Sequence, residues 1–92
     1  MVTAILLINA QPKKINDLAE QLVDVKGVSE VYSVGGRFDI VAIIRCKTND
    51  ELSDVVTNHV VDIDGILSTE TLIAFRTVSR HDLERMFSVG ME

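Results

Sequence analysis

The chain opens with an apolar run and then switches to a helical period. Residues 2–8 are almost entirely apolar, which is typical of a strand buried on both faces. After Gln11 and Pro12, apolar residues recur at spacings of three and four, as in one stripe of an amphipathic helix: Ile15, Leu18, Leu22 and Val25. Gly27 follows, and glycine accepts the left-handed backbone found at helix C-termini. This first stretch therefore predicts a strand followed by a helix.

Two apolar runs separated by a glycine pair come next. Residues 28–34 and 38–46 are rich in β-branched side chains, which favour strands. Gly35, Gly36 and Arg37 lie between them, and glycine readily adopts the positive φ angles of a tight turn. The pattern predicts a hairpin formed by the second and third strands.

A second helix and a fourth strand complete the pattern. Thr48 and Glu51 are spaced as a capping box, in which each side chain satisfies a free amide at the helix start. The apolar stripe that follows includes a histidine, which we expect to be hydrogen-bonded in the core or at an interface: Leu52, Val55, Val56, His59 and Val60. Gly65 ends this segment, and residues 66–77 predict the fourth strand.

The last residues predict a short C-terminal helix. Residues 79–82 read Ser-Arg-His-Asp, a helix start, and apolar side chains follow at i, i+3 and i+4: Leu83, Met86 and Phe87. Such a helix needs a surface to dock on, from its own sheet or from a neighbouring subunit. We expect a main domain over residues 1–78 and a helical extension over residues 79–92.

An internal repeat fixes the expected topology. The segment at residues 23–28 recurs at residues 61–66, and the same offset aligns the first strand with the third and the first helix with the second. The chain is thus β-α-β written twice. With right-handed crossovers, such units form an α+β ferredoxin-like βαββαβ sandwich. We expect a four-stranded antiparallel sheet of order 4-1-3-2 with two helices on one face.

This topology leaves one face of the sheet without a cover. The two central strands would be the first and the third, and both are apolar on both faces. The helices cover only one of these faces. A second copy of the chain would cover the other, burying about 800 Å² per partner in an ordinary stable dimer. The sequence therefore predicts at least a homodimer.

The chain is acidic and contains a single cysteine. Its formal net charge is −5 without a run of Lys or Arg, so direct DNA binding is not expected. Cys46 has no second cysteine to pair with, which excludes an internal disulfide. Every apolar run falls short of the roughly 18 residues of a membrane span, and no signal-peptide pattern is present. We expect a cytoplasmic protein without a membrane partner.

Few residues of this chain are suited to catalysis. Neither His59 nor His81 has a second ligand at the i, i+4 spacing of a helical zinc site. The glycine pair of the hairpin is not a phosphate loop, because no Lys-Ser or Lys-Thr follows it. Asp62 and Asp64 flank a helix exit and are explained as solvated loop carboxylates. Without a nucleophile, base and orienting group, the sequence predicts no enzyme, no cofactor and no metal site.

The hairpin turn is the strongest candidate for ligand binding. Its glycine pair exposes backbone amides, and Arg37 and Asp39 follow with opposite charges. Amides and a cation suit a carboxylate, and an aspartate suits an ammonium, so the turn is equipped to hold a small zwitterion. A solvated hairpin explains the same residues, because turns are polar for local reasons. From these residues alone both interpretations stay open.

Three motifs stand out along the chain: Gly27-Val28 after the first helix, the hairpin segment 31–40 with its Gly-x-x-Asp sequence, and the segment 64–71. Together they resemble the effector-binding domain of leucine-responsive regulators, the Lrp/AsnC family. This domain is also called RAM, for regulation of amino-acid metabolism. The resemblance spans residues 2–77. It implies homodimers formed through the sheets, rings of dimers, and an amino-acid effector bound between dimers.

The resemblance also implies the ligand-binding residues. They come from the hairpin and the start of the last strand: Gly35, Gly36, Arg37, Phe38, Asp39, Ser68, Thr69 and Thr71. Amides and Arg37 would bind a carboxylate, Asp39 would accept from an ammonium, and the hydroxyls would add hydrogen bonds. Simpler explanations exist for each. Asp39 can bind the hairpin's own amides, and threonine is a good strand former.

The chain departs from full-length members of that family in one respect. The first strand begins at Val2, so no N-terminal helix-turn-helix is expected. The chain therefore resembles a stand-alone sensor that acts through partners, among them a full-length relative. Two alternatives remain, an ACT-type regulatory subunit of a metabolic enzyme and a small ferredoxin-like monooxygenase or isomerase dimer. The residues name neither the effector nor the size of the ring.

Overall fold

The computed structural model describes residues 1–80 and confirms the βαββαβ order. Its elements, in chain order, are β1 (Val2–Ala10), the 3₁₀ turn η1 (Pro12–Lys14), α1 (Ile15–Val23), β2 (Val28–Ser33), β3 (Ile40–Cys46), α2 (Asn49–Asp54), the π-helix η2 (Val55–Val60) and β4 (Ile66–Ile73). The predicted C-terminal helix, with Leu83, Met86 and Phe87, lies outside the described residues. Within residues 1–80, no helix is long and apolar enough to cross a membrane.

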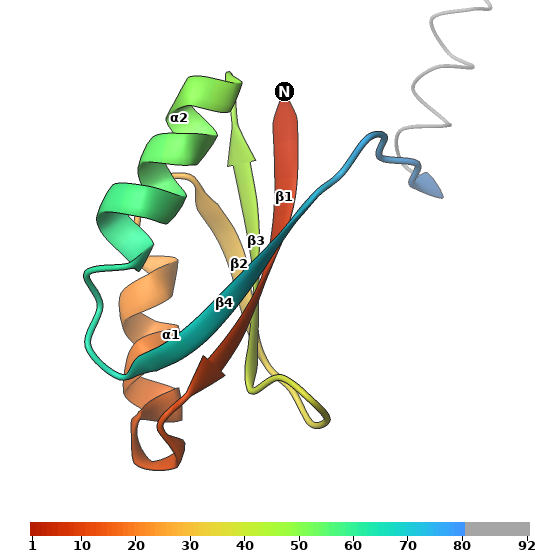
Figure 1. The fold of residues 1–92 in the computed structure, drawn as a ribbon. Helices are drawn as coiled ribbons and strands as arrows, with labels where there is room; N and C mark the ends of the chain where they lie inside the picture. Colours follow the sequence, from red (N-terminus) through yellow and green to blue (C-terminus); the bar gives the residue numbers. More distant parts are fainter. Residues whose placement is uncertain (81–92) are drawn as a thin grey trace, which may run out of the picture.

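The sheet has the order β2-β3-β1-β4, which is the predicted order read from the other edge. All neighbouring strands are antiparallel. Strand β1 is central, and its Leu6 lies opposite Ala42 of β3 and Thr71 of β4. Figure 1 shows α1 and α2 side by side on one face of the sheet, while the other face is open. The ferredoxin-like fold predicted from the internal repeat is therefore confirmed.

The core lies between the sheet and the two helices. Alternate residues of the central strands point toward the helices and are buried, as the period of two along a strand requires. The helices contribute leucines and valines at helical spacing. The buried set is Ala4, Leu6, Ile8, Ala10, Leu18, Leu22, Ile40, Ala42, Ile44, Cys46, Leu52, Val55 and Val60. No buried side-chain nitrogen or oxygen within residues 1–80 lacks a hydrogen bond.

The open face carries the remaining apolar residues of the central strands. Ile5 and Leu7 of β1 lie opposite Ile43 and Val41 of β3, and all four are partly exposed. Leu72 of β4 extends this surface. We refer to these five residues as the open-face patch. The sequence predicted that apolar residues would occupy both faces of the central strands, and the structure confirms this arrangement.

Several element boundaries differ from those predicted. Strand β1 extends to Ala10 rather than residue 8, and β4 ends at Ile73 rather than residue 77. Strand β3 starts at Ile40 instead of residue 38, because Phe38 and Asp39 belong to the hairpin loop. The loop is consequently wider than the tight turn that the sequence predicted. The amide of Val34 donates to the carbonyl of Asp39 (2.9 Å) and closes it.

His59 is hydrogen-bonded, as predicted, but it does not lie in the core, which was one of its two predicted placements. The histidine is exposed and its Nε2 lies 3.2 Å from Oδ2 of Asp54. The reason is the π-helix, in which residues five apart stack along the axis. A regular α-helix would have put His59 in the same stripe as Val55 and Val56. The wider turn moves the ring out of that stripe and places it next to Asp54.

Candidate ligand-binding site

The loop between β2 and β3 exposes its backbone. Gly35, Gly36 and Arg37 are all exposed. Gly36 has φ +122°, in the region that favours glycine, and a Cβ added at either glycine would meet no atom within 4 Å. The space beside both glycines is thus open to a ligand that approaches the backbone closely. Of the two glycines, only Gly36 has the positive φ that the sequence suggested for the pair.

Asp39 attaches this loop to the end of β1. Its amide donates to the carbonyl of Ile8 (2.9 Å), and its Oδ2 accepts from the amide of Ala10 (2.9 Å). The carboxylate therefore binds an amide of a neighbouring strand rather than one of the hairpin's own. Its second oxygen, Oδ1, makes no hydrogen bond within residues 1–80. One oxygen of Asp39 is structural and the other is available.

The start of β4 lies at the same end of the sheet. Asn9 pairs with Ser68 across the strands, and Asn9 Nδ2 donates to Ser68 Oγ (3.3 Å). Figure 1 shows the hairpin loop, the end of β1 and the beginning of β4 together at the lower end of the molecule. The hairpin loop and the start of β4, which are separated in sequence by β3 and a helix, therefore lie at the same end of the sheet (Figure 1).

The three predicted hydroxyls do not form one cluster. Thr69 and Thr71 lie opposite Ile8 and Leu6, whose side chains face the helices, whereas Ser68 shares the open face with Asn9. All three residues are exposed. Thr71 also lies two residues further from the hairpin end of the strand. Ser68 and the threonines therefore face opposite sides of β4.

Sequence reasoning missed the contribution of β1. Asn9 and the amide of Ala10 lie between the two predicted segments and contact both. The sequence feature that could have indicated this contribution is Asn9, a polar residue directly after an apolar run. A polar residue at the end of a central strand marks the point where the core stops. Only the strand register shows that this residue pairs with Ser68.

A lysine–aspartate pair stabilises the same end of the fold. Lys14 Nζ lies 2.8 Å from Asp64 Oδ2, so Asp64 is paired and not simply solvated as predicted. The hydrogen bond and the positive charge of Lys14 lower the pKa of Asp64, and Asp64 in turn raises the pKa of Lys14. The lysine stem also packs on Gly65, where an added Cβ would lie 3.0 Å from Lys14 Cδ. This contact joins η1 to the residue before β4.

The site is equipped for recognition rather than for bond chemistry. Its groups are exposed amides, the Arg37 guanidinium, the free oxygen of Asp39 and hydroxyls. The part of the chain from residue 1 to 80 contains no group of three or more metal-ligating side chains. No nucleophile lies beside a base among the predicted site residues. The arrangement suits a small polar ligand with a carboxylate and an ammonium.

Comparisons with known proteins identify the family. The family described as "Lrp/AsnC ligand binding domain" matches residues 3–83. The HTH-type transcriptional regulator PF1734 of Pyrococcus furiosus is 34% identical over 77 residues, covering 84% of this chain and 51% of the relative. The chain thus spans about half the length of the curated relatives it matches. These relatives are named as transcriptional regulators, a class that is not enzymatic.

Solved structures lead to the same family. The crystal structure of TTHA0845 from Thermus thermophilus is 42% identical with a TM-score of 0.81, covering 87% of this chain and 100% of that one. Escherichia coli AsnC is 30% identical with a TM-score of 0.79, covering 86% of this chain and 54% of AsnC. Together with the matching fold and the hairpin motif, these results show that the chain belongs to the Lrp/AsnC ligand-binding domain family.

Proposed function

We propose that this chain senses a small amino acid and regulates amino-acid metabolism or transcription through partner proteins. The observation that carries the proposal is the loop of residues 34–39, where open glycine backbone, Arg37 and one free oxygen of Asp39 occur together. Amides and a guanidinium recognise a carboxylate, and the aspartate oxygen recognises an ammonium. Ser68, Thr69, Thr71 and Phe38 complete the proposed site.

The structures of relatives support an amino-acid effector. A feast or famine regulatory protein from M. tuberculosis was solved in complex with L-methionine. It is 21% identical to this chain with a TM-score of 0.72, so the likeness extends to the fold. The fold is therefore compatible with amino-acid binding, while the effector of this chain is to be found by screening.

The proposed assembly begins with a homodimer. The open-face patch would be buried between two copies, and dimers would then associate into a ring with the hairpin loops at the contacts between dimers. Ser68 and the two threonines face opposite sides of β4, as the alternation along a strand requires. In a cleft between dimers they would therefore contact different subunits.

Regulation would require a partner that binds DNA. The net charge of −5, without clustered cations, is unsuited to phosphate contacts. We therefore expect no sequence-specific gel shift by the chain alone at physiological salt. A full-length Lrp/AsnC relative is the proposed partner, and co-purification tests this directly. A specific shift at nanomolar protein concentration would contradict the partner model.

A thermal shift screen with the twenty amino acids at millimolar concentration tests effector binding. A ligand at 100 times its dissociation constant stabilises a folded protein by about 2.7 kcal/mol. For a domain of this size, the melting temperature would rise by several degrees. If no amino acid raises the melting temperature, amino-acid sensing by this chain is refuted.

Two variants locate the site. Arg37→Gln removes an exposed charge that has no ion pair within residues 1–80, and Asp39→Asn removes the charge but retains an oxygen for the Ala10 amide. Both should eliminate the ligand-induced shift without lowering the melting temperature of the free protein. Arg76→Gln, an exposed cation outside the site, is the matched control. Equal responses of Arg37→Gln, Asp39→Asn and the control would place the effector elsewhere.

A further inference from the structure

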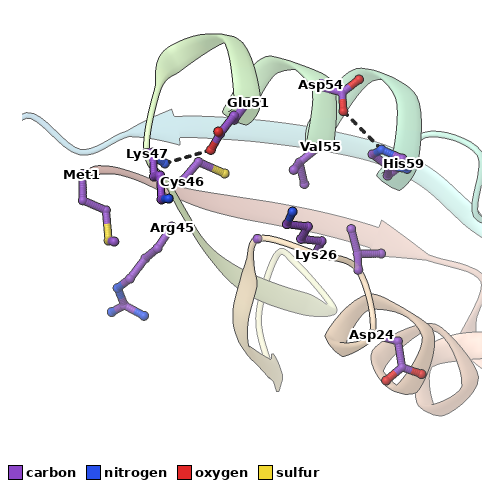
Figure 2. A pocket seen from close by; sticks show the side chains of 12 residues that line it. Met1, Asp24, Lys26, Arg45, Cys46, Lys47, Glu51, Asp54, Val55 and His59 are labelled. Carbon is purple, nitrogen blue, oxygen red and sulfur yellow. Dashed lines mark hydrogen bonds and ion pairs between the residues drawn. The ribbon is translucent and has the colours of Figure 1, made fainter.

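A second pocket lies at the other end of the sheet. It is formed by the loop after α1, the end of β3 and the helix α2–η2, and its volume is about 610 Å³. Cys46 in its wall pairs with Val2 at the start of β1, whereas the hairpin loop binds Ala10 at the end of that strand. Figure 2 shows the lining side chains. The pocket therefore shares no residue with the proposed amino-acid site.

The floor of this pocket is apolar and tightly built. Val25, Cys46 and Val55 line it, together with the backbone of Gly27. Gly27 has φ +99°, and an added Cβ would lie 3.1 Å from Val55 Cγ2 and 3.2 Å from Cys46 Sγ. The amide of Arg45 donates to the carbonyl of Gly27 (2.8 Å) and holds the loop against β3. Burial raises the pKa of the Cys46 thiol, which is therefore neutral and apolar.

Two of the carboxylates at the pocket are already hydrogen-bonded. Glu51 Oε2 accepts from the amide of Lys47 (3.1 Å), the residue before the Thr48 cap, rather than from Thr48 itself as the predicted capping box required. Asp54 accepts from Asn58 Nδ2 (2.7 Å) and contacts His59 Nε2 (3.2 Å). The hydrogen bond from Asn58, together with that from His59, lowers the pKa of Asp54. These acids are thus occupied within the protein.

The lysines at the pocket, in contrast, have free ammonium groups. Neither Lys26 nor Lys47 makes an ion pair or a side-chain hydrogen bond within residues 1–80, whereas Arg45 pairs with Glu30 (3.4 Å). Figure 2 shows Lys26 extending between the loop after α1 and the helix that carries Val55, with Asp24 further away at the rim. The pocket therefore combines an apolar floor with unpaired positive charge above it.

We propose that this pocket binds a small apolar carboxylic acid. The hydrocarbon part would pack on Val25, Cys46 and Val55, and the carboxylate would accept from Lys26, with Lys47 adding positive charge. The volume is within the range of about 300–1,000 Å³ typical of small-molecule sites, which combine apolar walls with a few polar groups. Glu51 and Asp54 are already hydrogen-bonded and Asp24 lies at the rim (Figure 2), so the recognition proposed here is that of the carboxylate by the lysines.

Titration with 4-phenylbutyrate tests this proposal on the full chain. Amide signals of Gly27, Cys46 and Val55 should shift in nuclear magnetic resonance spectra, with saturation at millimolar concentration or below. Bound acid should also slow alkylation of Cys46, the chain's only cysteine, by iodoacetamide. The neutral analogue 4-phenylbutyramide should bind about tenfold more weakly, since the charge-assisted hydrogen bond is lost. Equal binding of acid and amide would overturn recognition of the anion.

Charge-removing variants locate the contact. Lys26→Gln combined with Lys47→Gln should weaken 4-phenylbutyrate binding about tenfold or more and bring it to the level of the amide. Lys13→Gln, at an exposed lysine of η1 away from the pocket, is the matched control and should bind like the parent. If the double variant also binds like the parent, or if the acid shifts no pocket signal, the proposal is wrong.

The two sites are distinguished by crossing ligands and variants. Arg37→Gln should leave 4-phenylbutyrate binding unchanged, and the double lysine variant should leave any amino-acid thermal shift unchanged. If 4-phenylbutyrate instead shifts the signals of Gly35 and Gly36, the acid binds at the hairpin and the second site is refuted. Failure of the amino-acid screen would not affect this result, because the two sites share no residue.

Discussion

The two faces of the sheet differ although adjacent residues supply them. Leu6 and Leu7 are neighbours in β1 and chemically identical, yet Leu6 is fully buried under the helices and Leu7 is partly exposed on the open face. The environment of Leu6 is completed by α1 and α2 of the same chain. The environment of Leu7 consists of the open-face patch and solvent. The chain therefore covers only one of the two apolar faces of its sheet with its own helices (Figure 1).

The open face also has a polar margin. Glu30 of β2 accepts from the Tyr32 hydroxyl and lies near the Arg45 guanidinium of β3. The cluster stands at the border of the open-face patch, as Tyr32 lies opposite Val41 and Glu30 opposite Ile43. An apolar centre with a polar margin is the usual anatomy of a protein–protein interface. The core under the helices, by contrast, contains no buried polar or charged residue within residues 1–80.

The largest difference between the faces should appear on truncation of the covered residue. Leu6→Ala leaves a cavity in a closed core and should lower the free energy of unfolding by about 2–5 kcal/mol. Chemical denaturation measures this value. Leu67→Ala, at a leucine of β4 that is 63% exposed, is the control and should change stability by no more than about 0.5 kcal/mol. Comparable losses in both variants would contradict the assignment of the core.

A charge on the open face should act on assembly rather than on folding. Leu7→Asp would place an unpaired carboxylate in the proposed dimer interface, where burial costs several kcal/mol. In the monomer the same side chain remains partly exposed. Light scattering should therefore show a folded monomer for Leu7→Asp and a dimer or larger assembly for the parent. Val23→Asp, on the exposed side of α1, should leave assembly unchanged. A monomeric parent protein would refute the predicted dimer.

Removing the N-cap of α2 should lower the stability of the fold moderately. Thr48 Oγ1 accepts from the amide of Glu51 (3.1 Å) and caps α2, so Thr48→Ala should cost about 1 kcal/mol. Because α2 contributes to the cover over Cys46, alkylation of this thiol should become faster. Thr57→Ala, which removes a hydroxyl bonded to Ser53 of the same helix, should have less effect. Unchanged thiol reactivity in Thr48→Ala would argue against this role of the cap.

The smallest predicted effect concerns the polar margin. The hydrogen bond to Glu30 and its negative charge raise the pKa of Tyr32 above its usual 10.0. The pKa of Tyr32 rises because the Glu30 carboxylate stabilises the neutral phenol and repels the phenolate. As Tyr32 is the only tyrosine and the chain has no tryptophan, ultraviolet absorbance reports its titration directly. Glu30→Gln should move the midpoint back toward 10.0. A midpoint that does not respond would show that the contact is absent in solution.

The topology of the fold could be predicted because it depends on periodic patterns. The repeat of residues 23–28 at 61–66 and the two-sided apolar strands were sufficient for the strand order and for the placement of both helices. The exposed position of His59 could not be predicted in this way. It follows from a π-helix, and the apolar stripe is equally compatible with a regular α-helix.

The candidate sites were less accessible to sequence reasoning. The glycine pair and Asp39 identify the hairpin, but the bond from the Ala10 amide to Asp39 joins residues 29 positions apart and depends on strand register. The same register separates Ser68 from Thr69 and Thr71. The second pocket is formed by three separate segments, none of which contains a binding motif. In the sequence, Lys26 and Lys47 resemble ordinary solvated charges. The structure adds that both line a pocket and that neither is in an ion pair within residues 1–80.

The contact between Lys14 and Gly65 shows how the two halves of the repeat have diverged. Gly27 and Gly65 occupy equivalent places in the repeat and have φ values of +99° and +101°. At Gly65 the chain fills the neighbouring space with the hydrocarbon stem of Lys14, whose ammonium is neutralised by Asp64. At Gly27 the corresponding space is filled by apolar side chains, since an added Cβ would lie 3.1 Å from Val55 Cγ2 and 3.2 Å from Cys46 Sγ. The second pocket lies beside these side chains. The two halves of the repeat thus fill the space beside equivalent glycines by different means. One half uses a lysine paired with an aspartate at the surface, and the other uses apolar side chains that also line a pocket.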